Sequence, residues 1–529
     1  MNQLLGWRCT LCGATYAPHE IEYVCPQHGD AGIVDAVYDY AGIAAAASPR
    51  TLAASRDTSM WRYRALLPVA GDAPVPPLHV GGTPLYHAAA LGAQLGLPNL
   101  VVKDDGRNPT ASFKDRASAL VLLKAQEQRA AIVTTASTGN AGAALAGLAA
   151  SIGQPSVIFA PKTAPPAKVA QLLTYGATVL LVDGNYDAAF ELCLAASKEF
   201  GWYCRNTGYN PYTVEGKKTA AYEICEQLRW QAPDAIFVSV GDGNIITGLH
   251  RGLQDLLALG WIDKLPRLMA VQASGSSAIY NAWASGADTI TPVQATTVAD
   301  SIAADLPRDG LRGLRAIRET GGKAIQVTDD EILAAIPLLA RLTGVFAEPA
   351  GAAALAGLLA EIGERGLGSG ERRSEIGERR SGIGDRGSEI GDRRSGIGDR
   401  RSESGERRAE IGDWRLEIGD RRSEIGDWRL EIGDRRSEIG DRRSESGDRG
   451  SEIGDRRSGI GDRRSEIGDR RAEIGERGAG IAPEATVVLM ITGNGLKDIS
   501  SAMKASGQAT IIEPTLAAVK KAIGTSQGR

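Results

Sequence analysis

The amino-acid sequence predicts an α/β protein in which parallel β-sheets are covered by helices on both faces. Short β-branched apolar runs alternate with longer Ala- and Leu-rich segments from about residue 98 onward, and this alternation is typical of sheets built from βα units. A cysteine-rich leader precedes this body, and a tract of near-identical heptads interrupts it at residues 361–479. The length of 529 residues is sufficient for two or three domains.

The strands of the body are predicted from apolar runs that are each followed by a segment of helical composition. They are expected to be buried and to lie at residues 99–105, 130–137, 155–161, 177–184, 235–243, 267–274 and 487–492. The clearest helices are expected at residues 139–153 and 186–201. Because ligands of parallel sheets bind beyond the carboxyl ends of the strands, functional residues are expected in the loops that follow these runs.

The leader contains two pairs of metal-binding residue types, Cys9-x2-Cys12 and Cys25-x2-His28. Their spacing suits a structural zinc ion held in a tetrahedron by three thiolates and one imidazole. The alternative is a knuckle that keeps its fold without a metal. The remaining cysteines are scattered singly among apolar residues, as buried thiols usually are, at positions Cys193, Cys204 and Cys225.

Composition and hydropathy favour a cytoplasmic protein that contacts neither membranes nor nucleic acids. The first 30 residues lack a signal-type apolar stretch, and no run of about 18 apolar residues occurs. Outside the heptad tract the chain carries 32 basic and 34 acidic residues. This balance gives no electrostatic reason to expect a nucleic acid or an anionic membrane as a partner.

The heptad tract consists of 17 repeats, mostly close to EIGDRRS. A coiled coil needs two apolar positions per heptad, and here only one, usually Ile, is apolar. The third position is Gly in every copy, which costs about 1 kcal/mol per site in a helix. The tract is therefore predicted to be disordered or a marginal helix, a duplicated insert in a tolerant surface loop. The functional alternative is a polyampholyte docking arm.

Lys114, in the stretch NPTASFKDRAS, is the first candidate for chemistry because it opens the helix after the first body strand. A lysine amine can form an imine with an aldehyde and later act as a base. Ser137 to Asn140 follow the next strand, where free N–H groups suit a carboxylate. Gly241 to Ile245 form a Gly-rich turn suited to a phosphate, and the hydroxyl of Thr492 suits an uncharged ring nitrogen. Each feature alone has an ordinary structural interpretation, namely a surface lysine for Lys114, an N-cap for Ser137 to Asn140 and a tight turn for Gly241 to Ile245. Their combination is the specific signal.

These motifs together resemble the threonine synthase family of fold type II pyridoxal-phosphate-dependent enzymes. The resemblance rests on GGTPLY, NPTASFKDR, STGN, NPYTVEGKKT, VGDGN, FAEPAGAAA and TGNGLKD, and on the cysteine-rich leader followed by VYDY. It implies a tryptophan synthase β-like fold with two doubly wound α/β domains, and a homodimer. The implied organisation is a zinc-ribbon-like leader at 1–40, a linker and N-terminal extension at 41–97, a catalytic body at 98–360 and 480–515, and the insert at 361–479.

The resemblance also assigns roles to individual residues. Lys114 is expected to hold pyridoxal 5'-phosphate covalently and to move protons. Asn140 is expected to bind the 3-hydroxyl group of the cofactor, and Thr492 to face its ring nitrogen. The cofactor phosphate is expected to bind the backbone of Gly241, Asp242, Gly243, Asn244 and Ile245. The substrate is expected to contact Ser137, Thr138, Asn206, Thr207 and Lys218.

The implied reaction converts O-phospho-L-homoserine and water to L-threonine and phosphate. The family commonly has Arg at the position of Thr213, where a forked donor suits the departing phosphate, and Gly at the position of Ala111. Lys218, Lys217 or Arg205 is a candidate to compensate for the missing charge. Two enzymatic alternatives are threonine ammonia-lyase-like and cysteate synthase-like activities. The alternative from another class is a non-catalytic interaction scaffold.

Overall fold

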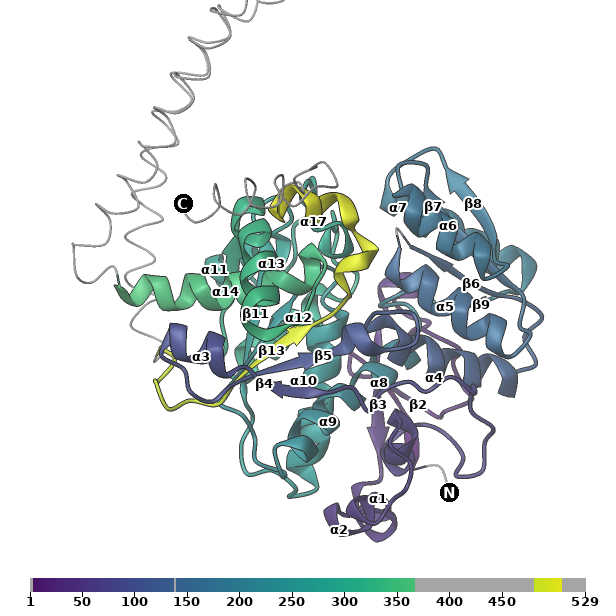
Figure 1. Ribbon diagram of the computed structural model, residues 1–529. Helices are drawn as coiled ribbons and strands as arrows, with labels where there is room; N and C mark the ends of the chain where they lie inside the picture. The colour runs from purple at the N-terminus through teal and green to yellow at the C-terminus, as the bar shows by residue number, and fades with distance from the viewer. Residues whose placement is uncertain (1–2, 138, 367–479, 507–529) are drawn as a thin grey trace, which may run out of the picture. The chain divides into compact units, whose positions relative to one another are not determined.

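The computed structural model describes residues 3–137, 139–366 and 480–506 (Figure 1). Residues 1–363 and 480–529 belong to one compact unit, and its described part contains three β-sheets. One small sheet lies in the leader, and two larger sheets form the body. No helix in the described ranges is long and apolar enough to cross a membrane.

The first body sheet has six strands in the order β12-β11-β10-β13-β5-β4, and all neighbours are parallel except β4 and β5. The strands are β4 (Leu85–His87), β5 (Leu100–Asp104), β10 (Ala235–Ser239), β11 (Arg267–Ala273), β12 (Ala324–Val327) and β13 (Val487–Ile491). The main helices around this sheet are α3 (Ala89–Leu95), α10 (Asn244–Ala258), α11 (Ala278–Ser285), α12 (Gly310–Glu319), α13 (Asp329–Thr343), α14 (Pro349–Gly366) and α17 (Ile499–Ser506). The order places β13, from the end of the chain, between β10 and β5.

The second body sheet has four parallel strands in the order β8-β7-β6-β9. They are β6 (Val133–Ala136), β7 (Ser156–Pro161), β8 (Thr178–Val182) and β9 (Tyr203–Cys204). The helices that lie beside it in Figure 1 include α5 (Asn140–Ser151), α6 (Pro166–Thr174) and α7 (Tyr186–Phe200). The strand order reverses direction after β8, and right-handed crossovers then place α7 on the face opposite α5 and α6. This is a doubly wound arrangement.

Further helices connect the two body sheets. They are α4 (Lys114–Glu127), α8 (Tyr212–Lys217) and α9 (Thr219–Gln227). Helix α4 packs against both α5 and α8, and its residues from Asp115 to Ala125 are buried. A helix that is buried all round has packing partners on every side, so α4 lies at the centre of the body.

The predicted α/β class and the seven predicted strands are confirmed, with one correction. Strand β8 was expected to be buried, but it lies at the edge of its sheet, and Leu180 and Leu181 are exposed. The apolar run predicted a strand there but gave no sign of its edge position. The short strands β4, β9 and β12 were not predicted, because runs of two to four residues carry little periodicity.

The leader folds as an antiparallel sheet in the order β2-β1-β3, formed by β1 (Leu4–Cys9), β2 (Thr15–Tyr16) and β3 (Val34–Tyr38). It packs on the body through an edge-on ring contact of Trp7 with Tyr212, whose centroids are 5.2 Å apart. The hydroxyl of Tyr38 donates a hydrogen bond of 2.5 Å to Glu215. Both contacts attach the leader to α8, because Tyr212 and Glu215 both belong to this helix.

The segment 41–97, which was expected to be a linker and N-terminal extension, is largely folded onto the body. It contains α1 (Tyr40–Ala46), α2 (Pro49–Ala53), the 3-10 helix η2 (Met60–Leu66), α3 and β4. Met60, Trp61 and Leu66 are buried, and Arg62 forms an ion pair of 2.7 Å with Glu226 on α9. Burial of this kind stabilises the body rather than separating two domains.

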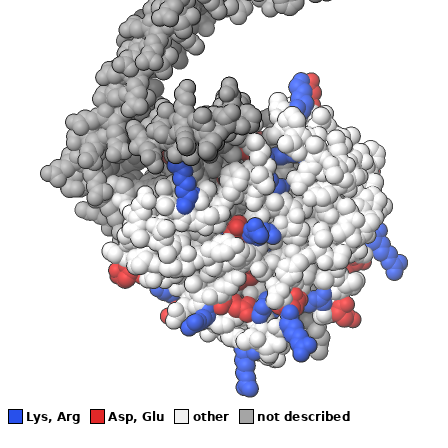
Figure 2. All heavy atoms as spheres, in the orientation of Figure 1, with Lys and Arg blue, Asp and Glu red and all other residues white. Residues whose placement is uncertain are grey.

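The heptad tract lies outside the described residues except for its beginning. Helix α14 continues to Gly366, past the predicted boundary at residue 360, and Glu361 forms an ion pair of 3.0 Å with Lys323. The other boundaries of the predicted organisation stay predictions. On the face drawn in Figure 2, Lys and Arg side chains lie interspersed with Asp and Glu, in keeping with the balanced charge of the body.

Candidate active site

Three adjacent strands of the six-stranded sheet bring the main candidate residues together. Lys114 follows β5, Gly241 to Ile245 follow β10, and Thr492 follows β13, which lies between the other two. The backbone N–H of Phe113 donates to the carbonyl of Thr492 at 2.9 Å. Because parallel strands end at one edge, these segments converge, and all three line one cavity.

Lys114 is the first residue of α4, and its amine has no hydrogen-bond or ion-pair partner among the described residues. Burial is the main cause that lowers the pKa of Lys114 to about 8. The buried Glu348 carboxyl opposes this shift, and the Arg205 guanidinium adds to it. A larger fraction of neutral amine is therefore available near neutral pH than for an ordinary lysine, as an imine-forming lysine requires.

The glycine-rich loop before α10 has a conformation that larger residues would resist. Gly243 has φ +87°, and a Cβ there would lie 2.6 Å from the carbonyl oxygen of Asp309. A Cβ on Gly241 would lie 2.8 Å from the Cα of Ile302. The loop leads into the N-terminus of α10, where backbone N–H groups and the helix dipole favour a phosphate.

Lys217 is a buried lysine that lines the same cavity as the glycine-rich loop. Its ammonium donates a hydrogen bond to the side-chain oxygen of Asn244. Burial, with the Arg205 and Lys114 charges, holds the pKa of Lys217 well below its ordinary value. A bound phosphate dianion would reverse this shift, since an opposite charge favours the protonated lysine.

Asn140 reaches the site from the four-stranded sheet, at the start of α5. Its amide nitrogen donates to Glu348 at 2.6 Å and to Ser301 at 3.1 Å. Its amide oxygen is buried and has no partner among the described residues. An unpaired buried acceptor is costly, so a hydroxyl donor from a bound group is favoured at this position.

Ser137 and Thr207 also line the cavities at Lys114, and Thr492 completes the wall. The hydroxyl of Ser137 accepts a hydrogen bond of 3.0 Å from the N–H of Gly139. The hydroxyl of Thr492 lies 3.4 Å from that of Ser239. Thr138, the other residue expected to receive the substrate carboxylate, lies outside the described residues.

Two of the predicted substrate residues are not brought to the cavity. The ammonium of Lys218 is buried between Glu215 at 2.7 Å and Asp255 at 2.9 Å. The side-chain oxygen of Asn206 accepts hydrogen bonds from the N–H of Ala136 at 2.7 Å and from the hydroxyl of Thr135 at 3.2 Å. Both side chains stabilise the fold around the site, because their polar atoms already have partners there.

The two departures from the family pattern have structural consequences. The hydroxyl of Thr213 is buried and donates to the carbonyl of Asn210 at 2.8 Å, so it supplies neither charge nor a free donor. Ala111 has φ +63°, a left-handed conformation that glycine adopts without strain. This conformation explains why glycine is usual there, and alanine costs about 1–2 kcal/mol in this region.

Several residues that line or border the site were not predicted. Tyr186, Asp300 and Ser301 line one cavity, and Ser301 also lines the other. Asp300 forms an ion pair of 2.5 Å with the buried Lys168. Glu348 lies within the quoted stretch FAEPAGAAA, so its motif was a usable signal, whereas the others come from segments with no distinctive pattern.

The residues of this site fit pyridoxal phosphate. The unpaired amine of Lys114 suits the aldehyde, the unpaired oxygen of Asn140 suits the 3-hydroxyl group, and the glycine-rich loop suits the phosphate. The hydroxyl of Thr492 is the candidate partner of the ring nitrogen. The fold and this set of groups define a pyridoxal-phosphate-dependent enzyme.

Comparison with known proteins identifies the family. Residues 77–372, more than half of the chain, match the family model described as "Pyridoxal-phosphate dependent enzyme". The threonine synthase of Methanocaldococcus jannaschii is 39% identical over 353 residues, covering 66% of this chain and 86% of that protein. The threonine synthase of Methanosarcina acetivorans is 42% identical over 353 residues, covering 66% and 85%. The chain therefore belongs to the threonine synthase family of pyridoxal-phosphate-dependent enzymes.

Among solved structures, maize serine racemase matches 52% of this chain and 80% of its own, with 26% identity and a TM-score of 0.46. The family membership, and not this structural match, makes the chain an enzyme that uses pyridoxal phosphate and acts on an amino-acid substrate.

The leader holds a candidate metal centre separate from this site. The ligand atoms of Cys9, Cys12, Cys25 and His28 all lie within 4.8 Å of one another. The Cys12 and Cys25 sulfurs are 4.0 Å apart, close to the separation of about 3.8 Å that Zn–S bonds of about 2.3 Å give in a tetrahedron. The hydroxyl of Tyr16 lies 3.0 Å from the Cys25 sulfur and can donate to a thiolate. The four side chains fit a structural zinc ion.

Proposed function

We propose that this enzyme converts O-phospho-L-homoserine and water to L-threonine and inorganic phosphate. The observation that carries the proposal is the unpaired amine of Lys114, which lines one cavity together with the glycine-rich loop and Thr492. The similarity to two threonine synthases, at about 40% identity, supports the choice of reaction.

The bound cofactor supplies an electron sink for carbanions next to the amino group of the substrate. Lys114 would take and return protons at its Nζ, which suits a group whose pKa is about 8. Asn140 and the loop at Gly241 to Ile245 would hold the cofactor in one orientation. Ser137 and the start of α5 would receive the substrate carboxylate, since N–H groups there favour anions.

Thr207 is the proposed contact for the departing phosphate, in place of the usual arginine. Its hydroxyl accepts a hydrogen bond of 2.8 Å from the Arg205 guanidinium, so its own hydrogen is free to donate into the cavity. The other terminal nitrogen of Arg205 has no partner among the described residues. Arg205 would thus act through Thr207, at the position where charge develops on the leaving group.

The test is a substrate panel on the purified enzyme loaded with pyridoxal phosphate. Phosphate and threonine should form together from O-phospho-L-homoserine, and neither should form with Lys114→Ala. No phosphate from this substrate would refute the proposal. Phosphate from O-phosphoserine alone would instead favour a β-replacement enzyme, and keto acid from threonine would favour an ammonia-lyase.

The role of Thr207 is tested separately with Thr207→Val, which keeps the shape and removes the donor. Turnover of O-phospho-L-homoserine should fall about 10- to 100-fold. This loss is equal to, or somewhat smaller than, the usual effect of removing one hydrogen-bond donor to a developing charge. Binding of pyridoxal phosphate should be unaffected. Thr174→Val is a matched control, because the Thr174 hydroxyl is exposed and donates within its own helix.

The oligomeric state and location complete the proposal. A homodimer is proposed from the family resemblance, and sedimentation of the holoenzyme tests it. A cytoplasmic location is proposed because all six cysteines are free, although several lie close together in the leader, and reducing compartments keep such thiols unoxidised. Fractionation of cells tests the location.

A further inference from the structure

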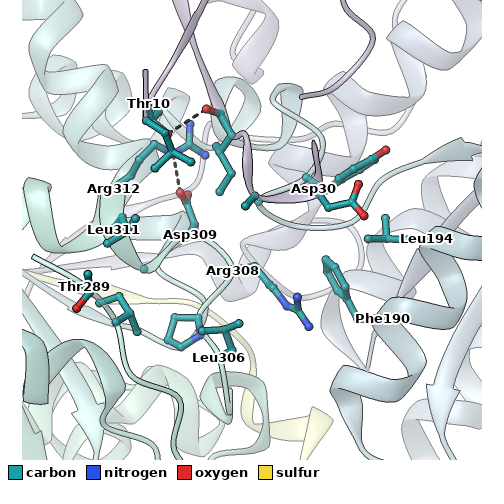
Figure 3. Close-up of a pocket in the computed structure, with 18 residues that line it drawn as sticks. Thr10, Asp30, Phe190, Leu194, Thr289, Leu306, Arg308, Asp309, Leu311 and Arg312 are labelled. Atoms are coloured by element: carbon teal, nitrogen blue, oxygen red, sulfur yellow. Dashed lines mark hydrogen bonds and ion pairs between the residues drawn. The ribbon is translucent and has the colours of Figure 1, made fainter. Parts of the chain in front are cut away.

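A second cavity, of about 390 Å³, lies between the leader, α7 and the start of α12. None of the residues that line it lines the cavities at Lys114. In Figure 3, Phe190 and Leu194 lie on one side of the open space, and Thr289, Leu306 and Leu311 lie on the other. The volume lies within the range of about 300–1,000 Å³ that is typical of small-molecule sites.

The charged groups around this cavity leave no cation for an anionic ligand. Arg308 forms ion pairs with Asp187 at 3.0 Å and Glu191 at 2.9 Å. Its guanidinium carbon also lies 4.3 Å from the centre of the Phe190 ring. Because two carboxylates surround one arginine, the local charge on this side is negative, and an anion would be repelled.

On the other side of the cavity the charges are balanced, because Arg315 also pairs with Asp35 at 3.9 Å. Arg312 is shared between Asp309 at 2.5 Å and Asp35 at 2.9 Å. Asp30 is paired with Lys198 at 2.8 Å. The ligand for which these groups are suited is therefore neutral or cationic.

The uncommitted polar groups in the lining are few. The hydroxyls of Thr289 and Tyr209 line the cavity and have no hydrogen-bond partner within the described ranges. One guanidinium nitrogen each of Arg308 and Arg312 also has no hydrogen-bond partner there, but these two atoms are buried and not exposed to the open space. The rest of the wall is mainly apolar, with Leu11, Ile33 and Leu306 among its members. Sites of this composition bind molecules that are mostly apolar and carry one or two hydrogen-bonding groups.

One wall of the cavity is hydrogen-bonded directly to the phosphate-binding loop. The N–H of Asp309 donates to the carbonyl of Asp242 at 2.8 Å. The side-chain amide of Asn244 donates to the Asp309 carboxylate at 2.8 Å. A ligand that displaces or fixes Asp309 would therefore change the position of the loop, because Gly243 leaves no space between them.

We propose that this cavity is an effector site for a small, mainly apolar molecule without negative charge, and that its occupancy alters the affinity for pyridoxal phosphate. The proposed effect on cofactor affinity rests on the proposed function, because it assumes that the cofactor phosphate binds the loop at Gly241 to Ile245. The proposed binding of the small molecule is independent of that assumption.

The binding half is tested on the holoenzyme with N-phenyl-1-naphthylamine, an uncharged dye that fluoresces in apolar surroundings. Leu311→Trp should fill the cavity and weaken dye binding by at least about tenfold, the usual effect of overpacking. Leu257→Trp is the control, since Leu257 is 37% exposed, close to the 40% of Leu311, and lies outside the lining. It should leave binding unchanged.

The charge argument is tested with 8-anilino-1-naphthalenesulfonate, which has the same rings and one sulfonate. It should bind at least about tenfold more weakly than the neutral dye. The proposal is overturned if the neutral dye shows no saturable binding, if Leu311→Trp binds it normally, or if the sulfonate binds more tightly. Dissociation of an oligomer by Leu311→Trp would also overturn it, and would identify the cavity as an interface between two copies of the chain.

The coupling half is tested by titrating pyridoxal phosphate into cofactor-depleted protein with and without saturating neutral dye. The dissociation constant of the cofactor should change by at least about fivefold, the lower end of typical allosteric coupling. An unchanged constant would overturn the coupling. Failure of pyridoxal phosphate to bind under either condition would instead refute the proposed function. The dye titration of the wild-type protein would still decide whether the cavity binds a small apolar molecule.

Discussion

The side-chain amide of Asn140 donates a hydrogen bond of 2.6 Å to the carboxylate of Glu348, and this contact joins the two body sheets at the active site. Asn140 starts α5 beside the four-stranded sheet, and Glu348 immediately precedes α14, which packs on the six-stranded sheet. Burial raises the pKa of Glu348. The same carboxyl raises the pKa of Lys114 against the effect of burial, so one group acts on both the amide that is proposed to position the cofactor and the amine that is proposed to react with it.

The pH dependence of cofactor capture should report the pKa of Lys114. The amine is protonated below about pH 8 and neutral above it, and only the neutral form attacks an aldehyde. The rate at which cofactor-depleted protein takes up pyridoxal phosphate should therefore rise with pH and level off above about 8. With an ordinary lysine, the rate would level off only near pH 10.5. Stopped-flow absorbance measures the rate, and a profile still rising at pH 9.5 would contradict the assignment.

Glu348→Gln should shift this profile to lower pH. The amide retains an acceptor for Asn140, so the fold should persist, but the negative charge that favours protonated Lys114 is lost. Glu484→Gln removes a charge from an exposed glutamate and serves as the control. The two variants are compared with wild type by the same uptake assay. A midpoint that stays in place or rises in Glu348→Gln would show that Glu348 does not act on Lys114.

Gly243→Ala should weaken cofactor binding far more than Gly260→Ala does. Both glycines have positive φ, +87° and +68°, so alanine costs each about 1–2 kcal/mol of stability. Only at Gly243 would the new Cβ also overlap a neighbour, the carbonyl of Asp309 at 2.6 Å, whereas Gly260 has open space. Equilibrium titration should show at least about a tenfold loss of cofactor affinity in Gly243→Ala alone. Equal affinities would mean that the loop does not hold the phosphate.

The sequence predicted the convergence of Lys114, the glycine-rich loop and Thr492, because each follows an apolar run and parallel strands end at one edge. It did not distinguish Lys217 from Lys218. One residue turns a helix by about 100°, so one lysine of the pair lines the cavity and the other is buried with Glu215 and Asp255. The periodicity of so short a segment does not determine which of the two lysines faces the cavity.

Other parts of the site depend on contacts between distant segments. Asp300 pairs with Lys168, and the Asp309 backbone supports the loop at Asp242. Neither Asp300, Lys168 nor Asp309 lies in a segment whose local pattern indicates a ligand. Their placement follows from how the helices and loops pack, which a single sequence does not specify.

The metal content of the leader should depend on His28 and not on His19. Both histidines are exposed, but only His28 places a ring nitrogen beside the cysteine sulfurs, 3.6 Å from that of Cys25. Purified wild-type protein and His19→Ala should contain about one zinc per chain, and His28→Ala should retain little. Elemental analysis measures the content, and thermal melting should show a lower Tm for His28→Ala. A wild-type protein with only trace zinc would refute the metal site.

Replacing residues 367–479 by a short Gly-Ser linker should leave catalysis intact and increase the stability of the body. The anchoring contacts on either side remain, since Glu361 pairs with Lys323 at 3.0 Å and the Arg267 guanidinium donates to the carbonyl of Gly480 at 3.3 Å. The tract is predicted to have no stable structure of its own, so shortening it lowers the entropy cost of closing the loop. Each halving of loop length contributes about 0.6 kcal/mol, which gives roughly 2 kcal/mol in total. Urea unfolding and the turnover of O-phospho-L-homoserine measure the two effects. Loss of turnover with cofactor still bound would assign the tract a role in the reaction, because the deletion touches none of the residues at Lys114.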